Sequence, residues 1–102
     1  QCFFHSAGGI KIGKNIGIGP GVKILTSFHK DTDTTIPILH EELEFKSVII
    51  EDDADLGVNS VIMPGVTIRK GTQVGAGAVV TKDFPEYSII AGVPAKLIRM
   101  RK

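Results

Sequence analysis

His29 ends the stretch GPGVKILTSFH, in which aliphatic residues recur at a fixed interval and then stop. A neutral imidazole accepts a proton near neutral pH, so a histidine can act as a general base toward a hydroxyl group. A base of this kind needs a partner that orients its ring. The sequence leaves four nearby carboxylates open for that role: Asp31, Asp33, Glu41 and Glu42.

A second stretch, VGAGAVVTKD at residues 74–83, combines small residues with a cation. Glycine and alanine at a chain corner let a flat ligand lie against the backbone. The charge of Lys82 suits recognition of a phosphate. The alternative is structural: Gly75 and Gly77 only form a corner, and Lys82 is a solvated charge.

Other residue sets favour metal or nucleophile chemistry less. The three histidines, His5, His29 and His40, include no pair closer than eleven residues, whereas a three-histidine zinc site of the carbonic anhydrase kind contains a close pair. EDDAD at residues 51–55 lacks the glycine and the final glutamate of a calcium loop. We therefore expect no metal site, and we interpret His5 and His40 as loop or surface residues.

A six-residue repeat must position these side chains. Its first position is a branched aliphatic residue in all nine hexads: Ile12, Ile18, Ile24, Ile50, Leu56, Ile62, Ile68, Val74 and Val80. A period of six excludes an amphipathic helix and indicates a short strand and a tight corner, repeated. The sequence therefore predicts an all-β fold, a parallel β-helix of about three coils.

Two segments interrupt or follow the repeat within a single predicted domain, residues 1–102. Residues 30–49 form an excursion loop, which in a compact domain usually has a use. The tail, residues 86–102, is expected to fold back over the open end or against a neighbour. Its basic run, residues 96–102, is expected to form a short helical turn or a frayed end.

The bulk composition excludes several classes of partner. Twelve Lys and Arg against eleven Asp and Glu give no charge excess for nucleic acid or an anionic membrane. No apolar run approaches the roughly 18 residues that span a bilayer. One cysteine, Cys2, cannot form an internal disulfide, so a cytoplasmic location is expected.

The run IMPGVTIRKGTQVGAGAVVTKDFPEYSIIAGVPAKLIR resembles the C-terminal part of the hexapeptide-repeat acyltransferases. Within that family it is most similar to the sugar, maltose/galactoside and polysaccharide O-acetyltransferases, over residues of about 10–99. The resemblance implies a left-handed parallel β-helix and a homotrimer with active sites between subunits. It also implies acetyl-CoA as donor and a hydroxyl-bearing, carbohydrate acceptor.

The resemblance also assigns roles to residues. His29, which precedes the excursion as the family's catalytic histidine does, is implied to be the general base for direct acetyl transfer. Ala76, Thr81 and Lys82 are implied to contact coenzyme A, and Arg99 to reach its phosphates, with Lys96 and Arg101 as further candidates.

Departures from the family pattern keep other functions open. Glu51, Asp55, Val58 and Arg69 differ from the usual residues, and the family's sugar-binding asparagine would fall before Gln1. The acceptor is then bound differently, for example by residues 30–49, or a family N-terminal region is lacking. The alternatives are a non-catalytic trimerising module and an acetyltransferase for an amine or an antibiotic hydroxyl.

Overall fold

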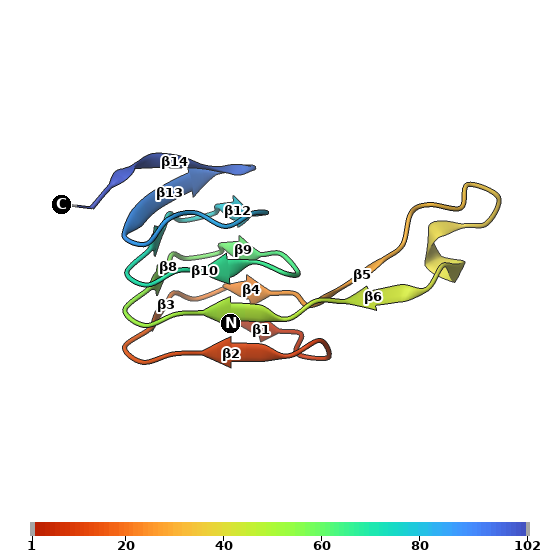
Figure 1. Cartoon of the computed structure of the whole chain (residues 1–102), viewed down its shortest axis with the longest axis horizontal. Helices are drawn as coiled ribbons and strands as arrows, with labels where there is room; N and C mark the ends of the chain where they lie inside the picture. The colour runs from red at the N-terminus through yellow and green to blue at the C-terminus, as the bar shows by residue number, and fades with distance from the viewer. Residues whose placement is uncertain (1, 102) are drawn as a thin grey trace.

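The computed structural model describes residues 2–101, whose strands stack into a β-helix with three sides (Figure 1). One coil consists of β2 (Ile10–Ile12), β3 (Gly17–Ile18) and β4 (Lys23–Ile24). The next consists of β7 (Val48–Ile50), β8 (Asp55–Leu56) and β9 (Val61–Ile62). The third consists of β10 (Thr67–Ile68), β11 (Gln73–Val74) and β12 (Val79–Val80). The predicted three coils of hexads are therefore present.

Equivalent strands of successive coils pair in parallel, which stacks the first-position residues in rows. Ile12 pairs with Ile50 and Ile50 with Ile68 on one side of the prism. Ile24, Ile62 and Val80 stack on another side, above Phe4 of β1 (Phe3–Phe4). Seven of the nine first-position residues are buried, and Ile12 and Ile18 are 38% and 37% exposed because they lie in the first coil.

The excursion is an ordered arm and not a structureless loop (Figure 1). It consists of β5 (Ser27–His29), a 3₁₀ turn η1 (Ile38–His40) and β6 (Leu43–Phe45). β5 and β6 pair antiparallel, so the chain leaves the stack before residue 30, and Val48 already belongs to the second coil. The arm therefore begins and ends earlier in the chain than the predicted residues 30–49. The reason is that the pairing of β5 with β6 begins inside the last hexad of the first coil.

The tail folds back over the C-terminal end of the stack, which is the first of the two arrangements expected from the sequence. β13 (Ser88–Gly92) pairs with β11, and β14 (Ala95–Met100) turns back antiparallel on β13. The predicted helical turn or frayed end at residues 96–102 is wrong through Met100, because main-chain bonds to β13 hold these residues extended. Lys102 and Gln1 lie outside the described residues.

Within residues 2–101, no helix is long and apolar enough to cross a membrane.

Candidate functional site

His29 is the last residue of β5, half-buried at the point where the arm leaves the stack. Its Nδ1 lies 3.2 Å from the main-chain carbonyl oxygen of Glu41. A carbonyl oxygen only accepts hydrogen bonds, so Nδ1 carries the proton and Nε2 of the neutral ring has a free lone pair. The geometry therefore provides an oriented proton acceptor at His29 Nε2.

The orienting group is not one of the four carboxylates that the sequence suggested. It is a main-chain carbonyl, which every residue carries and no sequence pattern marks. The Glu41 main chain is held on both sides: its N–H donates to Ile38 O at 3.0 Å, and the N–H of Lys30 donates to Glu42 O at 2.9 Å.

Charged side chains reinforce the same part of the arm. Lys30 Nζ lies 2.8 Å from Glu42 Oε1. The hydrogen bond and charge of Lys30 lower the pKa of Glu42, and Glu42 raises the pKa of Lys30. A hydrogen bond from Thr35 lowers the pKa of Asp33. Both carboxylates are solvent-exposed, so their interactions contribute little to the free energy of unfolding and mainly fix the geometry of the arm.

The residues implied to bind the donor are divided between sides of the prism. Thr81 and Lys82 follow Val80, which stacks two strands above Ile24 of β4. They therefore lie about 10 Å along the stack from the start of the arm, on the corner from which the arm that carries His29 leaves. Ala76 lies at a different corner, between β11 and β12, and Arg99 lies on β14 opposite Ile89.

Lys82 and the glycine that follows Ala76 have surroundings that bear on a donor. Lys82 Nζ lies 5.6 Å from the centre of the Phe84 ring, which holds the cation near the corner. Gly77 has a φ of +70°, and a Cβ placed there would meet no atom within 4 Å. The corner glycine is thus required by its backbone angle, and open space also lies over it.

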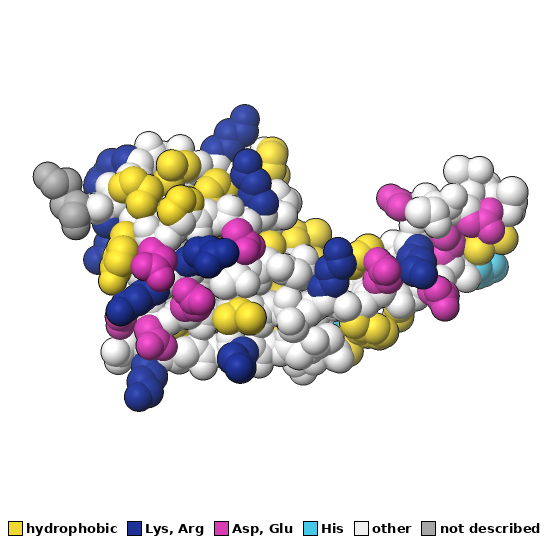
Figure 2. Space-filling view, in the orientation of Figure 1, with side chains coloured by type: hydrophobic (Ala, Val, Ile, Leu, Met, Phe, Trp, Pro, Cys, Tyr) yellow, Lys and Arg dark blue, Asp and Glu magenta, His cyan; other side chains and the backbone are white. Residues whose placement is uncertain are grey.

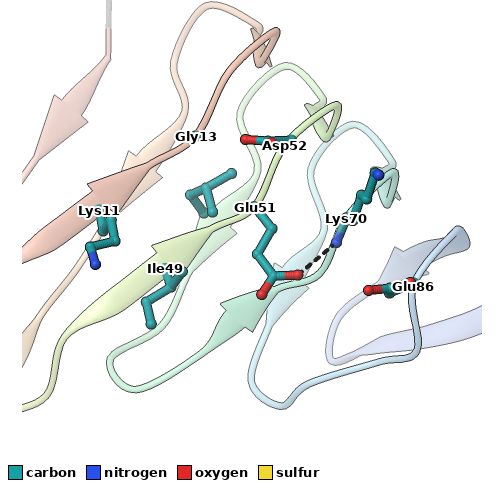
Figure 3. Close-up of a pocket in the computed structure, with 8 residues that line it drawn as sticks. Lys11, Gly13, Ile49, Glu51, Asp52, Lys70 and Glu86 are labelled. Carbon is teal, nitrogen blue, oxygen red and sulfur yellow. Dashed lines mark hydrogen bonds between the residues drawn. The ribbon is translucent and has the colours of Figure 1, made fainter.

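A cavity of about 460 Å³ lies away from His29, on the side formed by β2, β7 and β10 (Figure 3). Its lining includes Lys11, Glu51 and Lys70. Glu51 Oε1 accepts the Lys70 N–H at 3.0 Å, and Asp52 Oδ1 accepts the Lys14 N–H at 2.8 Å. Glu51, an unusual residue for its hexad position, therefore links neighbouring coils.

Arg69 is a second departure with a structural role, since its Nη2 lies 3.5 Å from Asp83 Oδ2 on the coil above. Asp83 Oδ1 also accepts the Thr67 N–H at 2.9 Å. Within residues 2–101, no three His, Cys, Asp or Glu side chains gather as metal ligands would.

Comparison with known proteins identifies the repeat. A family model described as the hexapeptide repeat of succinyl-transferase matches residues 47–82. A Schizosaccharomyces pombe protein, provisionally named an acetyltransferase, is 39% identical over 97% of this chain and 47% of its own length. The 2,3,4,5-tetrahydropyridine-2,6-dicarboxylate N-acetyltransferase of Staphylococcus aureus is 39% identical over 85% of this chain and 31% of its own length.

Among solved structures, a galactoside acetyltransferase in complex with coenzyme A superposes with a TM-score of 0.88 and 31% identity. It covers 97% of this chain, and this chain covers 48% of it. The predicted β-helix of hexapeptide repeats is thereby confirmed. The chain spans about half, or less, of the length of the curated relatives that it matches.

Proposed function

We propose that this chain, whose residues 47–82 match the hexapeptide repeat of succinyl-transferase, is a hexapeptide-repeat acyltransferase. We propose that it moves an acetyl group from acetyl-CoA directly to a hydroxyl of a sugar or polysaccharide. The observation that carries the proposal is the bond from His29 Nδ1 to the Glu41 carbonyl, which leaves Nε2 as the acceptor. We include in the proposal a homotrimer and a cytoplasmic location.

The proposed chemistry assigns His29 two proton transfers. His29 Nε2 accepts the proton of the acceptor hydroxyl while the oxygen of that hydroxyl bonds to the thioester carbonyl carbon. When the tetrahedral intermediate collapses, the carbon–sulfur bond breaks and the imidazolium returns the proton to the departing thiolate. The Glu41 carbonyl accepts a hydrogen bond from His29 Nδ1–H throughout, so it stabilises the imidazolium that forms between the two steps.

The donor side of the proposal uses Ala76, Thr81, Lys82 and Arg99. The open space over Gly77 leaves room for an extended ligand beside Ala76. Lys82 and Arg99 supply charges suited to phosphates. Since one chain spreads these residues over two corners and a sheet, we propose that the donor lies between neighbouring copies.

We expect purified protein to release free coenzyme A from acetyl-CoA only when a sugar acceptor is present. Replacing His29 by Ala or Gln removes the base and is expected to lower kcat about 10²- to 10⁴-fold. Binding of coenzyme A, measured by calorimetry, should not change. A His29→Ala rate within about twofold of the unchanged protein would overturn the assignment of the base.

The same assay tests the alternatives. An amine acceptor is favoured by the Staphylococcus aureus relative, whose name describes N-acetyl transfer. Turnover with amines and none with sugars would replace the hydroxyl acceptor by an amine. Coenzyme A binding without turnover on any acceptor, indifferent to His29→Ala, would indicate a non-catalytic trimerising module.

A further inference from the structure

The two-stranded arm has two chemically different faces. Ser27 and His29 are half-buried on one face, and Phe28 between them is exposed on the other, because successive strand residues alternate. Phe28 pairs with Glu44, and Lys46 Nζ lies 5.5 Å from the centre of its ring. Ser27 therefore lies on the same face of the arm as His29, the proposed base.

Ser27 is held by a residue from the start of the chain. Its Oγ lies 3.3 Å from His5 Nδ1. His5 lies in the loop after β1, one of the two places that the sequence suggested, and it is half-buried there. This bond brings a polar group of the segment QCFFHSAGG to the root of the arm, where sequence alone offered no acceptor-binding residue.

His5 is itself fixed by its neighbours. Its N–H donates to Ile24 O at 2.8 Å, and its carbonyl accepts from Thr26 Oγ1 at 2.6 Å. Its ring stacks on Phe3, with centroids 6.3 Å apart and planes 13° from parallel. His5, Ser27 and His29 therefore form a row of polar groups whose backbone is set by strand pairing.

An apolar row lies beside this polar row. Phe45 is directly opposite Ser27 and Leu43 is directly opposite His29 in the β5–β6 pair. Directly opposite side chains have Cβ atoms about 4.5–5.5 Å apart. Phe45 is 52% exposed and Leu43 is 48% exposed, and hydrophobic side chains are visible where the arm joins the stack (Figure 2).

We propose that this face of the arm is the acceptor site, and that it selects a ring with several hydroxyls over a simple alcohol. The reacting hydroxyl lies at His29 Nε2, and a second hydroxyl of the same ring bonds to Ser27 Oγ. The C–H face of the sugar packs on the Phe45 ring, which buries apolar surface. His5 is a positioning residue that orients Ser27. This inference rests on the proposed function.

Kinetics with methyl glucoside, methyl galactoside and methyl mannoside test the subsite. Loss of one hydrogen bond in Ser27→Ala, or of the aromatic surface in Phe45→Ala, should raise the KM for the sugar about three- to tenfold. kcat and the KM for acetyl-CoA should stay within twofold, about the scatter of such measurements. Phe28→Ala, on the opposite face of the same ribbon, is the matched control and should change neither KM.

A test of His5 must distinguish the orientation of Ser27 from a purely structural role of the residue. His5→Ala should raise the sugar KM as Ser27→Ala does, and His5→Asn, whose amide reaches the position of Nδ1, should restore it. Equal sugar KM values for Ser27→Ala, Phe45→Ala and Phe28→Ala would overturn the inference while leaving the proposed transfer intact.

A binding measurement separates this inference from the proposed chemistry. Titration of the unchanged protein with each methyl glycoside should shift the His5 ring resonances in NMR spectra, with or without turnover. Shifts without transfer would leave the subsite standing and remove the proposed reaction. No shift with any of the three glycosides would overturn the subsite.

Discussion

Two buried hydroxyl groups in the stack, Ser60 Oγ and Thr72 Oγ1, have no hydrogen-bond partner among residues 2–101. Thr26 is just as buried but is fully used: its Oγ1 accepts the Gly8 N–H at 2.9 Å and donates to His5 O at 2.6 Å. An unpaired buried hydroxyl costs about 1–3 kcal/mol relative to a paired one. Removing the hydroxyl should therefore have opposite effects on stability at the two threonines, Thr72 and Thr26.

We expect Thr72→Val to raise the free energy of unfolding by about 1 kcal/mol, because valine has the same shape and no polar group to bury. Thr26→Val should lower it by about 2 kcal/mol, because two main-chain groups lose their partner. Urea unfolding followed by circular dichroism measures both. If Thr72→Val destabilises the protein as much as Thr26→Val, the Thr72 hydroxyl has a partner and the argument is wrong.

Residue identity predicts some features of the site and not others. The position of His29, at the end of the last regular hexad before the arm, follows from the repeat. Its partner does not, because the Glu41 carbonyl belongs to the main chain and is placed by pairing across twelve residues. The contact between His5 and Ser27 was not predicted either, because the two residues lie 22 positions apart and meet only when β1 stacks against β4.

The glycines at the corners show how closely the coils approach. A Cβ at Gly57 would lie 2.6 Å from Val74 O and 2.8 Å from Ala76 N, both main-chain atoms of the coil above. At Gly77 a Cβ would meet nothing, and only the φ of +70° disfavours a side chain. The first glycine is required by stacking and the second by its own turn.

We predict that Gly57→Ala lowers the free energy of unfolding by about 3 kcal/mol or more, since two main chains must separate. Gly77→Ala should cost only about 1–2 kcal/mol, the penalty of a left-handed backbone for alanine. Chemical unfolding of the two variants side by side measures the difference. Equal losses would mean that the coils can spread at Gly57 without cost.

The elements differ in how far the sequence predicts them. Hexads specify strands and corners because each first-position aliphatic stacks on an equivalent residue, as Ile24 does on Ile62. The arm and β14 lie outside this period. Their antiparallel pairing joins β5 to β6 and β13 to β14 through main-chain groups, which leave no periodic mark in the sequence. The excursion was therefore predicted and its ribbon structure was not.

At the scale of the whole molecule, one chain does not bring the proposed donor and base residues together. The arm with His29 and the residue Lys82 follow strands of one side, β4 and β12, whereas Arg99 is on β14, in the sheet of β3, β8, β11 and β13. A single extended ligand contacting both His29 and Arg99 would have to pass around the prism. A cyclic trimer removes this difficulty, because the β14 side of one copy can face the arm corner of the next.

This arrangement predicts complementation between two inactive variants. His29→Ala removes the base, and Arg99→Glu repels the phosphates of the donor. Each alone should be inactive as a trimer, with a sedimentation mass three times the chain mass of 10.9 kDa. Refolded together in equal amounts, they should recover about one quarter of the unchanged activity, because one in four interfaces pairs an intact His29 with an intact Arg99. If each site were built within one chain, the mixed trimers would contain no intact site and activity would stay at the level of the single variants.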